Sequence, residues 1–276
     1  MAAILLLKIG NGPQFELSQK IPQVEFLSAT DTPAISNNYN QYTAVDSSFF
    51  NFSTINQNTY TVKLMMHFRG YGEYKSLRYD VYKLFVRKDY IQVQTDSEFP
   101  FIRNIRAVGF DIEPFSDGSH SAIITIPFEN PSGFKFSRKR SDEQDDLWDY
   151  FPIGWDIPEF VPGQFEYKNN RFKVYNPSNV VIDPYYQKSD LRIFIQFKGN
   201  SIELINETNN SNWKLNHSSD GTNQVVLNGI NATFDNTPCG QDTNFGNISL
   251  DKGWNQIQVN GATELDIRFS FPFTYV

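Results

Sequence analysis

Residues 60–88 read YTVKLMMHFRGYGEYKSLRYDVYKLFVRK, and the spacing of the apolar side chains changes within this stretch. From Tyr60 to Phe68 every second residue is apolar, which is the period of a half-buried β-strand. Between Glu73 and Lys88 apolar residues recur every three or four positions, as on one face of a helix: Tyr74, Leu77, Val81, Leu84 and Phe85. We therefore expect a strand followed by an amphipathic helix, the one helix that the periodicity supports.

Further strands are expected in the rest of the first half. Three strand-like runs follow the helix, at 90–94, 105–110 and 121–128, and Pro and Gly residues lie between them. The apolar run Ala2 to Leu7 is too short for a signal peptide core or for a bilayer span, which takes about 20 apolar residues. We interpret it as a first strand of a soluble protein. The first half is thus predicted to be a strand-rich domain with one helix.

The second half is predicted to be entirely β. Apolar residues alternate with polar ones at 191–197 and at 265–273, and shorter runs occur at 202–205, 225–227 and 257–259. Asparagine is dense between Asn200 and Asn260, which suits the tight turns that link short strands. No helical period competes with these patterns, so the sequence favours a β-sandwich.

A charge-dense passage separates the two halves. After Phe136 come Ser-Arg-Lys-Arg and then Asp142-Glu-Gln-Asp-Asp146, with no apolar residue until Leu147. Residues 1–140 carry 15 basic and 13 acidic side chains, a net charge of +2, whereas residues 141–276 carry 9 and 18, a net charge of −9. We therefore predict an N-terminal domain at 1–140, an acidic aromatic linker at 141–165 and a second domain at 166–276.

Composition argues against several classes of partner. The formal net charge is −7 and no stretch concentrates Lys and Arg, so nucleic acid is a poor candidate partner. The single cysteine, Cys239, excludes an intrachain disulfide and a multi-cysteine zinc site. No segment is predicted to insert into a membrane.

The residues that carry catalysis in other proteins form no recognisable motif. His67 lies on the polar side of its predicted strand, and His120 and His217 lie in predicted turns. None has a second His at metal-ligand spacing or a nucleophile motif to pair with. The acidic residues from Asp142 to Asp149 lack the spacing of a calcium loop, and Arg69-Gly-Tyr-Gly72 lacks the lysine of a phosphate-binding loop. We expect no catalytic, cofactor-binding or metal-binding residue, and no enzyme.

Several short motifs, in a particular order, resemble the distal tail proteins (Dit family) of long-tailed, non-contractile bacteriophages. The segment Phe172-Lys-Val-Tyr-Asn-Pro177 and the runs 191–197 and 202–208 look like the start of that family's carboxy-terminal domain. The stretch 250–261 before the last alternating run resembles its closing pattern of Leu, a turn Gly, Asn, a strand and Gly. The first half resembles the family in its order of strand, helix, hairpin and Phe128-Glu-Asn-Pro131. The departures are Trp254 and the acidic, aromatic passage from Asp142 to Trp155.

This resemblance implies a β-rich N-terminal domain that closes into a hexameric ring and a galectin-like β-sandwich that projects from it. It also implies a function: a structural hub of the phage tail tip or baseplate, made in the bacterial host cytoplasm and located in the virion. The implied partners are other copies of the chain, the tail tube protein, the tail-associated fibre or lysin protein, and receptor-binding or baseplate proteins. Strand edges or a protruding hairpin could supply the ring contacts.

Two alternatives remain open. A cell-wall glycan-binding module of the phage adhesion device is the main one, because Trp148, Tyr150 and Trp155 form a local aromatic cluster on which sugar rings could stack. The nearby prolines make these aromatics equally suited to fixing a linker, and the chain lacks the signatures of true galectins. A tail-associated hydrolase is the other alternative, and the absence of a His, Cys or Ser constellation argues against it.

Overall fold

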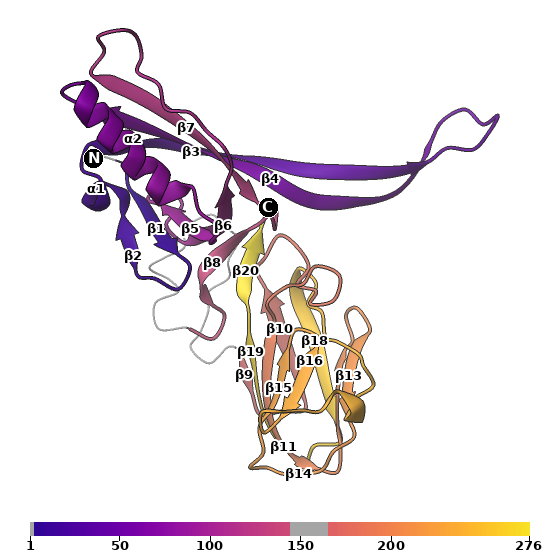
Figure 1. Cartoon of the computed structure of the whole chain (residues 1–276). Coiled ribbons are helices and arrows are strands. Elements are labelled where there is room, and N and C mark those ends of the chain that lie inside the picture. Colours follow the sequence, from indigo (N-terminus) through magenta and orange to yellow (C-terminus); the bar gives the residue numbers. More distant parts are fainter. Residues whose placement is uncertain (1–2, 144–164) are drawn as a thin grey trace. The chain divides into compact units, whose positions relative to one another are not determined.

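The structure is a computed structural model that describes residues 3–143 and 165–276, and these residues are mainly β (Figure 1). The mainly β class expected from the sequence is confirmed. The chain divides into two compact units, Met1–Lys135 with Val276, and Phe136–Tyr275. We call them unit 1 and unit 2.

Unit 1 is a twisted antiparallel sheet with a helix on it. Its strands pair in the order β2-β1-β5-β6-β7-β4-β3. The elements are β1 (Leu5–Ile9), β2 (Gln14–Glu16), α1 (Leu17–Lys20), β3 (Val24–Asn40), β4 (Phe49–His67), α2 (Tyr71–Phe85), β5 (Ile91–Thr95), β6 (Phe101–Ala107) and β7 (Ser121–Asn130). The short helix α1 was not predicted from the sequence.

The core of unit 1 lies between α2 and the sheet (Figure 1). The predicted helix at 73–88 is confirmed with shifted ends, and all five of its predicted apolar residues are buried. The ring of Phe85 packs 5.7 Å from that of Phe128 on β7. The alternation of β4 is also confirmed, because Val62, Leu64 and Met66 are at most 1% exposed. Each such side chain stabilises the fold by about 1.5–3 kcal/mol.

Unit 2 contains two sheets and a further pair of strands. One sheet has the order β10-β18-β12-β13, and the other has the order β17-β16-β15-β11-β19-β9, with β14 also paired to β11. The elements are β8 (Lys135–Arg140), β9 (Glu166–Tyr167), β10 (Arg171–Asn176), β11 (Arg192–Gly199), β12 (Ile202–Asn206), β13 (Ser211–Leu215), β14 (Ser219–Asp220), β15 (Val225–Asn228), β16 (Asn231–Phe234), β17 (Thr237–Pro238), the 3-10 helix η2 (Gly240–Asp242), β18 (Gly253–Asn260), β19 (Glu264–Ser270) and β20 (Pro272–Tyr275).

The inward side chains of both sheets form the core of unit 2. Ile195, Phe197 and Ile267 come from one sheet, and Leu204 and Trp213 come from the other; each is at most 1% exposed. The strands pair antiparallel, so residues on one face alternate with residues on the other. Two sheets that bury facing sides in this way form the sandwich layout expected from the sequence.

Two strand boundaries differ from the prediction. The run predicted at 105–110 is β6 at Phe101–Ala107, because the strand begins before a buried Arg103 that hides its apolar pattern. The alternating run predicted at 265–273 is divided between β19 and β20, with Phe271 between them. The division arises because the two parts have different partners: β19 pairs with β11 and β9, and β20 pairs with β8.

Residues around 140, where the sequence placed the end of the first domain, are held by the end of the chain. The Ser141 backbone N–H donates to the Phe271 carbonyl at 2.9 Å, and the Phe273 N–H donates to Ser137 Oγ at 2.8 Å. Arg140 Nε donates to Ser270 Oγ at 2.7 Å. Most of the predicted linker lies outside the described residues, so its extent stays a prediction.

Candidate functional site

The hairpin of β3 and β4 extends past the sheet of unit 1 (Figure 1), and we call residues 34–57 the arm. β4 pairs with β7 only from Asn58 to His67. Toward the tip, from Ala34↔Asn56 to Asn40↔Phe49, the two strands pair with each other and with no other described strand. A two-stranded hairpin of this kind is marginally stable in water by itself.

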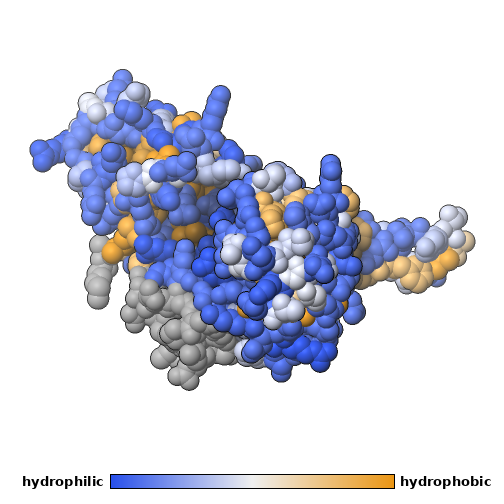
Figure 2. All heavy atoms as spheres, turned by 90° about the horizontal axis from the view of Figure 1, so that it is seen from below, coloured by the Kyte–Doolittle hydropathy of each residue, from blue (hydrophilic) through white to orange (hydrophobic). Residues whose placement is uncertain are grey.

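The side chains of the arm are exposed, although many of them are large and apolar. Exposure runs from 46% to 65% for Ile35, Tyr39, Tyr42, Val45, Phe49, Phe50 and Phe52. Figure 2 shows the arm at the right with apolar, orange side chains along one side. Two pairs of rings contact across the hairpin, Tyr39 with Phe50 at 5.9 Å and Tyr42 with Phe49 at 5.7 Å. The rings therefore contact one another rather than a core.

The arm also lacks the charges that usually protect an exposed hairpin. Asp46 is its only charged residue, and the other polar side chains are mostly Asn, Ser, Thr and Gln. Soluble proteins commonly place Lys, Pro or inward-pointing charges on exposed strands, because unpaired strand edges associate with other chains. An aromatic hairpin with a single charged residue is therefore a surface that favours association.

A buried ion-pair network anchors the root of the arm. Arg103 on β6 is 4% exposed; its Nε lies 2.8 Å from Asp31 Oδ2 on β3, and its Nη1 lies 2.6 Å from Glu98 Oε2. Its guanidinium also covers the ring of Tyr60 on β4 at 4.8 Å. Lys135 Nζ adds a second bond to Glu98 at 2.9 Å. One cation thus joins both strands of the hairpin to the body of unit 1.

This network shifts the protonation of its members. Burial by itself would raise the pKa of Glu98, but the hydrogen bond and charge of Arg103, and then those of Lys135, lower that pKa below its ordinary value. Burial raises the pKa of the Tyr60 hydroxyl to about 12. At neutral pH Glu98 is therefore an ionised carboxylate and Tyr60 a neutral phenol.

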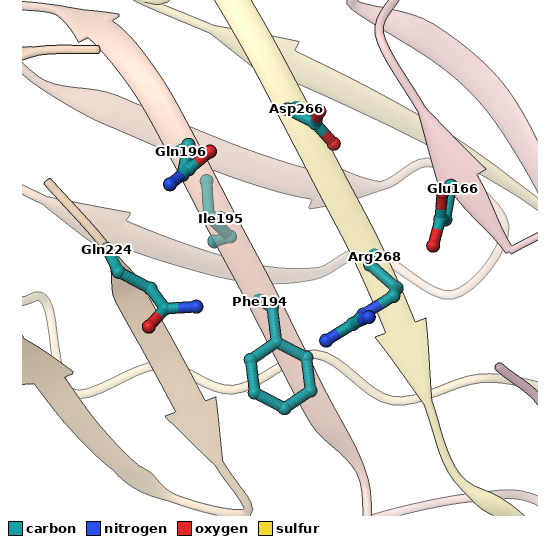
Figure 3. Close-up of a pocket in the computed structure, with 7 residues that line it drawn as sticks. All are labelled: Glu166, Phe194, Ile195, Gln196, Gln224, Asp266 and Arg268. Carbon is teal, nitrogen blue, oxygen red and sulfur yellow. The ribbon is translucent and has the colours of Figure 1, made fainter. Parts of the chain in front are cut away.

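Unit 2 presents a hollow on the outer side of its larger sheet (Figure 3). It is lined by Glu166, Phe194, Ile195, Gln196, Gln224, Asp266 and Arg268, and we call it the β11/β19 face. The strand register places Phe194 opposite Arg268, and Gln196 opposite Asp266. Glu166 on β9 lies opposite Arg268 on its other side. The face thus combines one phenyl ring, two amides, two carboxylates and one guanidinium.

The aromatic cluster proposed from the sequence, Trp148, Tyr150 and Trp155, lies outside the described residues. The three histidines are far apart in the sequence and in different surroundings. His67 Nδ1 lies 2.9 Å from Ser121 Oγ, the ring of His120 lies 6.4 Å from that of Phe68, and His217 stacks on Phe234 at 4.3 Å. None of these contacts joins two histidines.

Cys239 and groups of metal-ligating side chains are the other candidates for a reactive site. Cys239 is buried, and burial raises the pKa of its thiol. No group of three or more His, Cys, Asp and Glu in residues 3–143 and 165–276 is placed to hold a metal ion. In those same residues no helix has the length and apolar character to cross a bilayer.

The sequence prediction missed both the arm and the β11/β19 face. The arm has a weak signal, since Phe50 and Phe52 alternate with polar residues and almost no charge occurs in residues 34–57. The polar positions of β11 and β19 were visible as the alternate phase of apolar runs. Which strands lie side by side could not be read from those runs.

Comparisons with known proteins find matches among solved structures. No family model matches the sequence, and neither does any curated protein. A crystal structure of the Dit protein (gp 19.1) of phage SPP1 matches with a TM-score of 0.64 and 12% identity, over 98% of this chain and 99% of that chain. That protein is described as a paradigm of the hub adsorption apparatus of phages that infect Gram-positive bacteria.

Weaker matches come from the baseplate of phage p2 in its activated conformation. The structure with Ca has a TM-score of 0.46 and that with Sr a TM-score of 0.45, each at 10% identity over 99% of this chain and 98% of the matched chain. At such low identity the SPP1 match bears on the fold. The chain has the fold of the SPP1 Dit protein.

Proposed function

We propose that this chain is a structural hub at the tip of a phage tail, where six copies close into a ring. The observation that carries this proposal is the arm: an exposed, aromatic hairpin with a single charged residue, on a chain that has the fold of the SPP1 Dit protein. Association with another chain would remove its rings from water and complete its strand pairing. In the isolated subunit the rings stay exposed and the strands of the arm pair only with each other among the described strands.

Ring closure requires two different surfaces on every copy, because the contacts of a cyclic assembly larger than a dimer run head to tail. The arm is the first surface. The exposed side of α2 is a suitable second one, since Tyr71 and Tyr79 are 70% and 66% exposed there, and Val86 just after the helix is 59% exposed. In our proposal the arm of each copy packs against unit 1 of the next.

The hub joins parts of the virion and performs no chemistry. One side of the ring docks the tail tube protein, and the other docks the tail-associated fibre or lysin protein. Unit 2 carries receptor-binding or other baseplate proteins. The protein is made in the cytoplasm of the bacterial host and ends in the tail tip.

The test is the mass of the purified chain in solution, measured by light scattering after gel filtration, with negative-stain images of the same fraction. We expect six copies in a ring with a central hole. The double variant Tyr39→Asp/Phe50→Asp should be monomeric. Because both side chains are more than half exposed, its melting temperature should stay close to that of a wild-type monomer.

The matched control is Tyr186→Asp/Phe245→Asp, which places the same charges on two aromatic side chains of unit 2 that are 85% and 82% exposed. It should form the same ring as the wild type. A wild-type chain that stays monomeric at high concentration, or an arm variant that still forms rings, would contradict the proposal.

A further inference from the structure

The β11/β19 face is built by strand alternation, so its side chains are fixed on a rigid sheet. On β11, Ile193, Ile195 and Phe197 point into the core, each 1% exposed, which turns Phe194 and Gln196 outward. On β19 the buried residues Ile267 and Phe269 likewise turn Asp266 and Arg268 outward. The stick view in Figure 3 shows these outward side chains around a common hollow.

We propose that this face of unit 2 is a binding site for a neutral saccharide. The inference goes beyond the hub function and does not depend on ring assembly. The apolar side of a sugar ring would lie against the part of the half-buried Phe194 ring that the Arg268 guanidinium leaves uncovered, and its hydroxyls would bind the polar groups around that phenyl ring.

The mixture of groups is the main argument for a saccharide. A sugar hydroxyl both donates and accepts hydrogen bonds, so a matching site needs acceptors, donors and groups that are both. Asp266 and Glu166 accept, Arg268 donates, and the amide of Gln196 does both. Gln196 and Asp266 are directly opposite each other, with Cβ atoms about 4.5–5.5 Å apart, so their polar ends can reach neighbouring hydroxyls.

The site is partly organised before binding. The Arg268 guanidinium lies over the Phe194 ring, 4.6 Å from its centroid. Among residues 3–143 and 165–276 its Nε has no hydrogen-bond partner, and Asp142 Oδ2 lies 3.6 Å from it. Asp266 has an ion pair with Lys168 at 3.8 Å, but both side chains are more than half exposed, and exposed ion pairs contribute little to stability. Asp266 can therefore exchange this partner for a hydroxyl at little cost.

Other ligand classes fit less well. A polyanion such as nucleic acid or a polyol phosphate would meet the two carboxylates as well as Arg268. A lipid chain needs a wide apolar surface, and this hollow offers a single phenyl ring. An extended peptide pairs with a strand edge, whereas these groups project from the face of paired strands.

The test is ligand-observed saturation-transfer NMR on the full chain. The probes are neutral methyl glycosides of glucose, galactose, mannose, rhamnose and N-acetylglucosamine, with their β-linked disaccharides, and polyglycerol phosphate as the anionic comparison. We expect saturable binding of at least one neutral saccharide. Asp266→Asn should weaken that binding roughly tenfold, the effect of losing one charged hydrogen bond, and Phe194→Ala should abolish it.

Two controls separate the site from general effects. Glu207→Gln removes an exposed, ion-paired carboxylate from the loop after β12 in the other sheet, and Tyr186→Ala removes an exposed ring from unit 2 outside this hollow. Both should bind as the wild type does. If Phe194→Ala unfolds unit 2, Asp266→Asn still decides, because its side chain is exposed.

Three results would overturn the inference: no binding of any neutral probe, binding that Asp266→Asn leaves unchanged, or binding of polyglycerol phosphate alone. The hub proposal is tested separately, by the mass that light scattering gives for the purified chain.

Discussion

Replacing Arg103 by Met should destabilise unit 1 and leave unit 2 unchanged. Methionine keeps much of the aliphatic volume of the buried side chain but removes the cation between Asp31 and Glu98. Removing one partner of a buried pair typically costs about 3–5 kcal/mol. Here the Asp31 carboxylate is 22% exposed and keeps Asn58 as a partner, and the Glu98 carboxylate is 30% exposed and keeps Lys135. We therefore expect the free energy of unfolding to fall by about 2–3 kcal/mol.

The two units can be followed with different probes. All four tryptophans lie after residue 135, and Trp213 is fully buried in unit 2, so its fluorescence reports on unit 2. The helix signal in far-ultraviolet circular dichroism comes chiefly from α2 in unit 1. Arg103→Met should lower the melting temperature of the helix signal by roughly 6–12 °C and leave the fluorescence transition in place.

The control is Arg106→Met on the same strand. Arg106 donates one hydrogen bond to the Lys88 carbonyl at 2.7 Å and covers the partly exposed ring of Tyr90, and it has no ion pair described. Arg106→Met should lower the free energy of unfolding of unit 1 by no more than about 1 kcal/mol. Equal losses for the two variants, or no shift of the helix signal in Arg103→Met, would refute the assignment of Arg103 as the anchor of the arm.

Three further predictions concern pH, a turn and the thiol. The pKa of Glu98 is lowered in the folded chain, so its contribution to the free energy of unfolding should be complete above its ordinary pKa near 4.5. That contribution should be lost as the pH falls through the pKa of the folded chain. Urea titrations at several pH values should show this loss in the wild type and a smaller loss in Arg103→Met. Gly133→Ala should lower the melting temperature of unit 1, because φ is +73° and a Cβ there would collide with the Asn56 carbonyl. Gly118→Ala is the control: its φ is +77° but a Cβ there meets no atom, so it adds the backbone strain without the collision and should lower the melting temperature less. Cys239 should react with a thiol reagent much more slowly in native than in unfolded protein, and equal rates would contradict its burial.

The sequence predicted the elements that bury one face. The helix at 71–85 and the alternating strands β4, β11 and β19 were readable because a regular apolar period records which side meets a core. The arm was missed because neither of its sides is buried within the chain, so its sequence carries no such period.

The β11/β19 face was missed for a different reason. Each of its residues occupies an ordinary polar position of an amphipathic strand, and single positions of that kind say nothing about ligands. The face exists only because β9, β19, β11 and β15 lie side by side, and long-range pairing such as Gln196 with Asp266 cannot be derived from spacing. Arg103 shows the converse, since a buried charge made a true strand resemble a polar segment.

The pairing of β8 with β20 has a consequence for biosynthesis. Unit 1 can begin to fold as soon as residues up to about 135 have left the ribosome, since strands β1 to β7 have been translated at that point. Residues 136–143 lack their backbone partners in residues 269–275 until those residues have been translated. Because contacts so distant in sequence form slowly, the final acquisition of structure should belong to unit 2, and nascent chains halted before residue 269 should expose the 136–143 segment to proteases.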